Sequence, residues 1–223
     1  MKDSNYDFLS RHYSLFNMLD KVRFYKAIWS NNDELLNAKL EDTFLTLADA
    51  VKNKHIAVVG NARSLCTTSY GRAIDSKDIV IRINRAPMFS EFSHGTKTDW
   101  LALATTIEKR HFESLSTKKL IWMSHKRKRL KQWMMEKPLY LFPQELYAEI
   151  KQSIGAPPST GLMMLYWLSK TSFASLNIYG FDFFKSLSLT GSRTEDQVPH
   201  DFKAEQDWFN SIKNSRNNIY FYN

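Results

Sequence analysis

The chain has 223 residues, is 43% hydrophobic and carries a formal net charge of +8 at pH 7. This length allows a full core in one large domain, or in one domain with an appendage. The basic balance points to an acidic partner such as a nucleic acid, an anionic membrane or a phosphorylated substrate. The only cysteine, Cys66, excludes an intrachain disulfide, which favours a reducing compartment.

The sequence shows neither a secretory signal nor a membrane span. Residues Met1–Ser10 are polar and lack the apolar segment of a signal peptide. The longest apolar run, Leu162–Leu168, is far shorter than the ~18 residues of a membrane-spanning helix. We therefore expect a cytoplasmic protein.

The first fifty residues predict helices. Apolar residues recur at helical spacing in the stretches 8–19 and 35–47, and the polar cluster Ser30–Asp33 between them can connect and cap helices. We interpret residues 1–50 as an N-terminal helical extension packed on the core, and residues 51–223 as the main domain.

From Lys54 onward, short apolar runs alternate with helical patterns. Strands separated by helices imply βαβ units, so we expect an α/β fold with a largely parallel sheet flanked by helices. The expected strands are 56–59, 79–83, 99–104, 119–123, 139–142, 176–180 and 218–221, and the expected helices lie near 106–116, 126–136, 144–153, 160–171 and 201–214.

The densest basic segment is Lys126–Lys131 (KRKRLK). A nucleic-acid interface would need aromatic residues among these charges and a matching module, and neither is present, so we expect no nucleic-acid partner. A solvated helix face is the commonest meaning of such a run. Contact with an anionic acceptor or membrane surface is the second interpretation.

Two asparagines follow two neighbouring expected strands. Gly60-Asn61 ends the first strand and Asn84 ends the second, so both side chains should lie at the carboxyl edge of the sheet, where α/β proteins bind ligands. The surrounding sequence matches neither the G-x-G-x-x-G fingerprint nor a Walker loop, which disfavours dinucleotides and P-loop chemistry. Taken alone, Asn61 is more often a turn residue than a ligand contact.

Pro157-Pro158-Ser159-Thr160-Gly161 precedes a buried helix. The hydroxyls of Ser159 and Thr160 and the free N–H groups of a helix start form an anion site suited to a phosphate or carboxylate. A plain helix cap is the commoner meaning of this pattern alone.

His200 stands at the start of another expected helix, where the positive end of the helix dipole disfavours imidazolium. A neutral imidazole there could act as a general base near pH 7, although a single histidine beside a helix cap is usually a surface residue. The other histidines show no ligand spacing and only one cysteine is present, so we expect no metal.

In their order along the chain, these segments resemble glycosyltransferase family 29, the animal-type sialyltransferases. The resemblance covers roughly residues 55–210. The large sialylmotif is similar to AVVGN at 57–61, Ile74-Asp75-Ser76, Val80-Ile81-Arg82-Ile83-Asn84, Arg85-Ala86-Pro87 and Gly95-Thr96-Lys97-Thr98. The small sialylmotif is similar to Pro158-Ser159-Thr160-Gly161 through Ile178-Tyr179-Gly180-Phe181, and the very small motif to His200 and Glu205.

The resemblance implies a Rossmann-like fold, a variant of the single-Rossmann-domain glycosyltransferase fold, and a CMP-activated sugar acid as donor. It implies inversion at the anomeric carbon without a metal or other cofactor. Carried over by motif, Gly60, Asn61 and Asn84 would bind the CMP nucleotide, and His200 would deprotonate the acceptor hydroxyl. Ser159, Thr160 and Gly161 would hold the phosphate and the sugar carboxylate.

The chain also departs from the family pattern. It lacks the disulfide and the membrane anchor of the animal enzymes, which suits a short, soluble, bacterial-type member. The His/Tyr-rich third motif has no counterpart in 186–198, so the group that protonates the leaving phosphate is not identified. Thr105 or Thr106 replaces the asparagine that usually follows the Gly-Thr-Lys segment. The spacing of His200 and Glu205 gives no role for Glu205, because five residues along a helix do not share a face.

Several alternatives remain open. The donor sugar can be sialic acid or Kdo, and a Kdo transferase would act on lipopolysaccharide, with the enzyme peripheral to the inner face of a membrane. The acceptor would be a glycan or lipid-linked sugar, recognised by the unmatched segments 136–154 and 184–198. An adenosylmethionine-dependent transferase and a non-catalytic basic nucleotide- or glycan-binding module are further alternatives.

Overall fold

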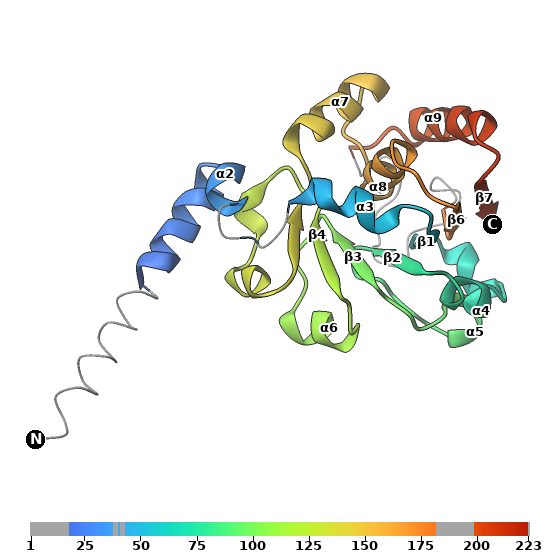
Figure 1. The fold of residues 1–223 in the computed structure, drawn as a ribbon, viewed down its shortest axis with the longest axis horizontal. Coiled ribbons are helices and arrows are strands. Elements are labelled where there is room, and N and C mark those ends of the chain that lie inside the picture. Colours follow the sequence, from blue (N-terminus) through green and yellow to red (C-terminus); the bar gives the residue numbers. More distant parts are fainter. Residues whose placement is uncertain (1–17, 38–39, 41–42, 182–198, 223) are drawn as a thin grey trace, which may run out of the picture.

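A seven-stranded parallel sheet forms the centre of the molecule (Figure 1). The computed structural model describes residues 18–37, 40, 43–181 and 199–222. All six pairings between neighbouring strands are parallel, in the order β5-β4-β3-β2-β1-β6-β7. The strands are β1 (His55–Val59), β2 (Ile79–Ile83), β3 (Trp100–Leu103), β4 (Lys119–Trp122), β5 (Leu139–Leu141), β6 (Ser175–Tyr179) and β7 (Ile219–Tyr222).

Strand β1 lies where the direction of the strand order reverses. The chain adds β2 to β5 on one side of β1 and then returns to add β6 and β7 on the other. Val58 pairs in register with Ile81 of β2 and with Ile178 of β6. The crevice at the carboxyl ends of the strands beside such a reversal is the usual ligand site of open α/β sheets, so the fold places Asn61 and Asn84 in that region.

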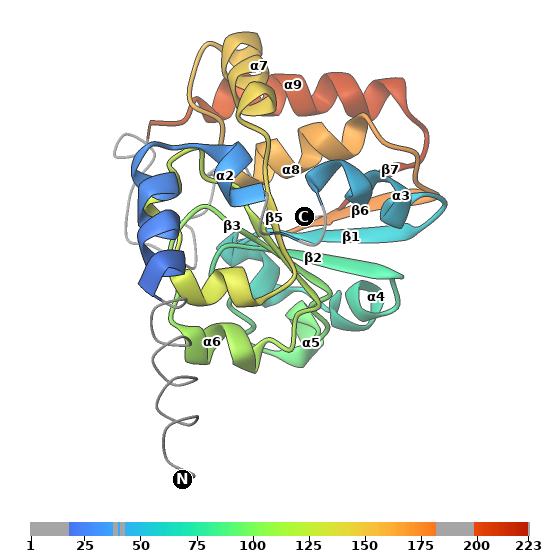
Figure 2. The same cartoon turned by 60° about the vertical axis from the view of Figure 1, so that its left-hand side comes forward.

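Helices cover both faces of the sheet (Figure 2). The helices α3, α7, α8 and α9 lie on one face, and α4, α5 and α6 lie on the other. Their bounds are α3 (Leu47–Val51), α4 (Gly71–Asp75), α5 (Glu91–His94), α6 (Lys109–Ser114), α7 (Gln144–Ile154), α8 (Thr160–Ser169) and α9 (Phe202–Ser215); the shorter α2 (Asp33–Asn37) precedes them, and the 3₁₀ turns are η1 (Phe44–Thr46), η2 (Arg63–Thr67), η3 (Arg127–Arg129) and η4 (Gln132–Glu136).

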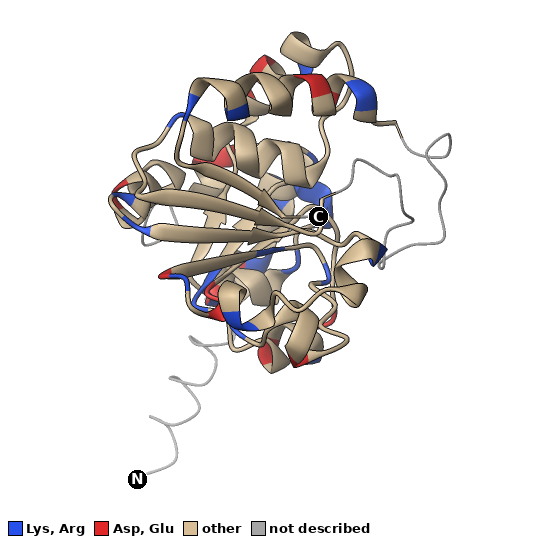
Figure 3. Ribbon diagram, turned by 90° about the vertical axis from the view of Figure 1, so that its right-hand side faces the viewer, with Lys and Arg blue, Asp and Glu red and all other residues tan. Residues whose placement is uncertain are grey.

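The strands are apolar because both of their faces are buried. Val58 and Ile81 pack into the core under α8, whereas Ala57 and Val80 pack on the opposite face near α4. A parallel sheet covered on both sides requires this near-continuous apolar sequence. Figure 3 shows the result: the strands are uncharged along most of their length, and charged residues gather on helices and at strand ends.

The expected α/β architecture and its parallel sheet are confirmed, and each of the seven strands lies within two residues of its expected bounds. The helix expected over 126–136 is wrong: the segment forms the turns η3 and η4. Arg127 within it is buried and bonded to Asp33 instead of lying on a solvated helix face. The sequence does not predict α4 and α5, because helices of four or five residues are too short to show a periodic pattern.

The described N-terminal helices pack on the sheet. The helix over residues 18–29 buries Phe24, Ala27 and Ile28, and α2 buries Leu36. These side chains share one apolar cluster with residues of β3, β4 and β5, such as Leu103. In the described part of the chain, no helix combines the length and the apolar character needed to cross a bilayer.

A buried ion pair fixes this N-terminal segment. Arg127 is fully buried, and its Nε and Nη2 each lie 2.6 Å from a carboxylate oxygen of Asp33. The guanidinium also donates to the carbonyl oxygens of Ser124 and Phe142, which follow β4 and β5. The bidentate geometry and the extra acceptors are what a buried guanidinium requires. Arg127 therefore connects the N-terminal helices to the ends of two strands.

Replacing Asp33 with asparagine (Asp33→Asn) should lower the free energy of unfolding by about 1–3 kcal/mol, because Arg127 stays buried without its counter-charge. The loss is moderated by the partial exposure of the Asp33 side chain, 23%. Urea unfolding measures it. The exposed neighbour Glu34 provides the control: Glu34→Gln should change stability by less than about 0.5 kcal/mol. Equal stabilities of the two variants would contradict the assigned role.

Candidate active site

The two asparagines meet at the carboxyl edge of the sheet, as the sequence predicts. Asn61 follows β1, and its Nδ2 donates to the carbonyl oxygen of Ile83 at the end of β2 (3.1 Å). Asn84 directly follows β2. Asn61 therefore joins the ends of β1 and β2, and both side chains remain partly exposed.

Asn84 connects three elements through its amide and its backbone. Its φ is +55°, a left-handed conformation that asparagine tolerates better than most residues. Its Oδ1 accepts from the backbone N–H of Ala104 after β3 (3.0 Å), and its Nδ2 lies 3.5 Å from Oγ1 of Thr160 in α8. The backbone conformation and the amide together bring the end of β2 to the start of α8.

Thr105 lies at the same edge, after β3, and is half-buried. It makes no hydrogen bond with any other residue that the structure describes. Thr106 differs, because its Oγ1 donates to the carbonyl oxygen of Arg129 (2.8 Å). Of these two candidates, only Thr105 therefore has a hydroxyl proton that no other described residue accepts.

Of the two candidate cap residues, Ser159 and Thr160, the structure assigns the cap of α8 to Ser159. Its Oγ accepts from the backbone N–H of Leu162 (3.1 Å). The helix itself is buried along nearly its whole length. The backbone N–H groups of Thr160 and Gly161 belong to the first turn, where a helix offers no carbonyl partner. This helix start therefore carries the positive potential of the dipole next to Asn84.

Glu205 acquires a role that its sequence position did not reveal. It lies in α9, is 3% exposed, and accepts 2.7 Å hydrogen bonds from both the backbone N–H and the hydroxyl of Ser159. Burial raises the pKa of the Glu205 carboxyl to about 7, although the two bonds from Ser159 act in the opposite direction. Glu205 thus holds the cap of α8 from the first turns of α9. His200, just before α9, and Glu205 within it both contact the segment 157–159.

His200 is fixed in one tautomer. Its Nδ1 lies 2.8 Å from the carbonyl oxygen of Pro157, and a carbonyl can only accept, so Nδ1 carries the proton. Its Nε2 is therefore the acceptor atom. Burial lowers the pKa of His200, and the bond to Pro157 opposes this shift. The cap of α9 is Asp201, whose side chain accepts from Ala204 N (2.9 Å). The imidazole is accordingly neutral near pH 7, as a general base requires.

The ring of Phe181 explains why two positions of the site are glycine. A Cβ on Gly161 would lie 2.4 Å from Cε1 of Phe181, and a Cβ on Gly60 would lie 2.8 Å from Cδ2 of the same ring and 2.3 Å from the carbonyl oxygen of Gly180. The ring of Phe181 therefore packs against both the turn after β1 and the start of α8. Glycine is needed at both positions for this close approach.

The segments proposed for acceptor recognition differ in how far the structure describes them. The region of the third motif, 186–198, and the possible acceptor segment 184–198 lie outside the described residues. The other possible acceptor segment, 136–154, contains β5 and α7. Among the described residues, no group of three or more His, Cys, Asp or Glu side chains could hold a metal ion.

The raised pKa of Glu205 predicts a pH-dependent stability. The unfolded chain loses this proton near pH 4.5 and the folded chain near pH 7, so folding binds a proton in between. Stability from this group should therefore fall as pH rises from 4.5 to 7, by up to about 3 kcal/mol. Urea unfolding of the wild type and of Glu205→Gln at pH 5 and pH 8 tests this. The wild-type advantage over the variant should shrink at pH 8, and a constant difference would refute the assignment.

Adding a methyl group at Gly161 tests the packing of Phe181. Gly161→Ala should lower the free energy of unfolding by about 1–3 kcal/mol, because the ring must move away from the start of α8. Phe181→Leu shortens the side chain, so the double variant should lose less than the sum of the two single losses. Thermal unfolding of the wild type, the two single variants and the double variant gives the coupling between the two positions. Strictly additive losses of stability would show that the ring of Phe181 is not the reason for glycine at position 161.

Comparisons with known proteins identify the family. Residues 4–137 match the family model of glycosyltransferase family 29 (sialyltransferase). Over 72 residues the chain is 38% identical to CMP-N-acetylneuraminate-beta-galactosamide-alpha-2,3-sialyltransferase 1 of Mus musculus. This alignment covers 32% of the chain and only 18% of the mouse protein.

Two solved structures share the fold. A mammalian sialyltransferase in complex with Gal-beta-1-3GalNAc-ortho-nitrophenol superposes with a TM-score of 0.59 at 19% identity, covering 91% of this chain and 85% of the other. A variant of the sialyltransferase CST-II in complex with CMP gives a TM-score of 0.52 at 11% identity, with 75% and 80% covered. The Rossmann-like glycosyltransferase fold is therefore confirmed, and because the family match spans more than half of its residues, the chain belongs to glycosyltransferase family 29, the sialyltransferases.

Proposed function

We propose that the protein transfers sialic acid from a CMP-activated donor to a hydroxyl group of a glycan or glycolipid acceptor, with inversion and without a metal. One observation carries the proposal beyond family membership. A neutral histidine, whose Nε2 accepts from no other residue that the structure describes, and the capped start of α8 are held together through Pro157 and Ser159. A base and an anion site in fixed relation are what this transfer requires.

The donor would lie along the carboxyl edge of the sheet. Gly60, which lets the backbone turn closely, and the amides of Asn61 and Asn84 would bind the nucleotide, together with the hydroxyl of Thr105. Amides suit a nucleotide because they both donate and accept hydrogen bonds.

The start of α8 would bind the acidic groups of the donor. The N–H groups of Thr160 and Gly161 suit a phosphate and a sugar carboxylate. Ser159, whose N–H and hydroxyl both donate to Glu205, would position these groups. A CMP-sugar releases a single phosphate, so the helix dipole and these donors could stabilise the leaving group without Mg²⁺.

In the transfer step, Nε2 of His200 would take the proton of the acceptor hydroxyl. The acceptor oxygen would attack the anomeric carbon, and the bond from that carbon to the CMP phosphate oxygen would break with its electrons remaining on CMP. Attack from the side opposite the leaving group inverts the configuration. The bond from Nδ1 to Pro157 would keep the ring oriented as it becomes imidazolium.

The excess positive charge of the chain supports a role at an anionic membrane surface, with a lipid-linked acceptor and a cytoplasmic, peripheral location. The phosphate and carboxylate contacts proposed above are common to CMP-sialic acid and CMP-Kdo. For this reason both donors belong in the experiment.

Transfer and hydrolysis assays with CMP-Neu5Ac and CMP-Kdo test the function. His200→Ala should lower turnover by about 10²–10⁴-fold while CMP binding is retained, because only the base is removed. His55→Ala is the matched control, since His55 lies at the opposite, amino end of β1, and its turnover should equal that of the wild type.

Failure to bind or turn over either donor would refute the proposal, and turnover of CMP-Kdo alone would reassign the sugar. A pH profile adds an independent check. Because burial lowers the pKa of His200, kcat/KM should stay high until the pH drops below the ordinary histidine value of 6.5. A fall that begins above this value would contradict the base assignment.

A further inference from the structure

The N-terminal helix over residues 18–29 carries an apolar stripe that faces away from the protein. The side chains of Met18, Val22, Tyr25 and Trp29 are 54%, 60%, 51% and 78% exposed. Successive residues of a helix are rotated by about 100°, so these four fall within an arc of about 60°. Four adjacent large apolar side chains on one helix face are unusual on a protein surface, where single exposed apolar residues are the norm.

The opposite side of this helix explains why the stripe stays outside. Phe24, Ala27 and Ile28 are buried in the cluster formed with β3, β4 and β5. The connection that follows the helix is held by the bidentate pair of Asp33 with the buried Arg127. The helix cannot rotate to bury the stripe without losing this packing, so the stripe is a fixed surface feature.

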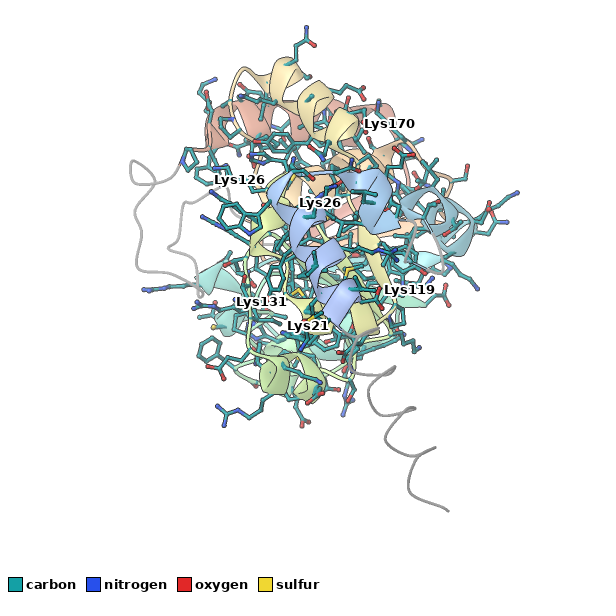
Figure 4. All side chains as sticks on the ribbon, turned by 90° about the vertical axis from the view of Figure 1, so that its left-hand side faces the viewer. Lys21, Lys26, Lys119, Lys126, Lys131 and Lys170 are labelled. Carbon is teal, nitrogen blue, oxygen red and sulfur yellow. The ribbon has the colours of Figure 1, made fainter. Side chains whose placement is uncertain are left out.

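Lysines border the stripe on both sides. By the same helical rotation, Lys21 and Lys26 lie about 40° beyond its two edges. Figure 4 views this face of the molecule and shows Lys126 and Lys131 on it as well. None of these four lysines forms an ion pair with another described residue, and all four are exposed.

We propose that this face binds the surface of an anionic phospholipid bilayer, with the helix lying in the plane of the interface. The apolar side chains would enter the boundary between headgroups and acyl chains, to the depth of about 5–10 Å typical of such helices. Tyr25 and Trp29 have the amphipathic rings that favour this zone. The lysines would place their ammonium groups among the phosphates while their stems cover apolar surface.

Charge distinguishes a bilayer from a second copy of the chain. A twofold contact through the stripe would bring the same lysines of two copies against each other, which is repulsive. An anionic bilayer instead compensates all of them at once. Within the described residues, this helix is not a candidate for crossing a membrane.

The structure also limits which basic residues can take part. Arg127, in the middle of the Lys126–Lys131 run, is fully buried by its pair with Asp33 and cannot reach a partner. The basic run is therefore divided between an internal role for Arg127 and a surface role for Lys126 and Lys131. This membrane surface bears on the peripheral location in the proposed function, and its test uses neither donor nor acceptor, so failure here is distinguishable from failure of the transfer reaction.

Co-sedimentation with phosphatidylcholine vesicles tests the proposal. The vesicles are prepared without phosphatidylglycerol and with ~30 mol% of it. Wild type should bind the anionic vesicles. The double variant Tyr25→Ser/Trp29→Ser should bind them more weakly, by a factor of about ten or more. Lys21→Gln/Lys26→Gln should lose about fivefold per lysine, and raised salt should reproduce that loss. Phe92→Ser removes an aromatic residue of similar exposure, 71%, from α5 and should bind like the wild type.

Fluorescence locates the contact. Trp29 is by far the most exposed tryptophan of the chain, so brominated lipids should quench wild type but not Trp29→Phe, which should still bind. Absence of binding to anionic vesicles, or equal binding by Tyr25→Ser/Trp29→Ser, would overturn the proposal. So would a wild-type dimer in light scattering that this variant abolishes, because the stripe would then be an interface between copies.

Discussion

The contact between the starts of α8 and α9 is the interaction on which the candidate site depends. The carboxylate of Glu205 accepts hydrogen bonds from the backbone N–H and the hydroxyl of Ser159. The oxygen of the same hydroxyl caps α8. Two residues earlier, the carbonyl oxygen of Pro157 fixes the ring of His200. The proposed base and the proposed anion site are therefore parts of one hydrogen-bonded unit. A shift of either helix would change both, which is the kind of preorganisation that group transfer needs.

This unit has an electrostatic cost. A carboxylate that is 3% exposed loses most of its hydration, and the pKa of Glu205 rises to about 7 as a result. A negative charge at the start of α8 would also compete with a phosphate for the same helix dipole. The raised pKa reduces this competition, because near neutral pH the group is protonated in a substantial fraction of molecules. A phosphate at the start of α8 is therefore compatible with the buried carboxyl of Glu205 beside it.

Two arginines of this basic chain are buried, and their charge stabilises the fold instead of contributing to the surface. Arg82 of β2 is 1% exposed and donates to the carbonyl oxygens of His94 and Lys97, and burial lowers its pKa to about 10. Arg127 holds the N-terminal helices through Asp33. Both lie in segments whose sequences suggest ligand contacts. Instead, Arg82 fixes the connection between β2 and β3, and Arg127 fixes the orientation in which the helix over 18–29 presents its stripe.

The sequence alone determined the α/β class, the seven strands, the meeting of Asn61 with Asn84 and the cap at Ser159. These features depend on local patterns: apolar runs bounded by turns, and a hydroxyl residue just before an apolar helix. Only the tertiary structure decided the role of Glu205, the tautomer of His200 and the burial of Arg127. Each depends on a partner far away in sequence, 46 residues for Glu205 and Ser159 and 94 for Arg127 and Asp33. No local periodicity encodes such pairs, since they form only when the sheet brings α8 beside α9 and the N-terminal helices beside the ends of β4 and β5.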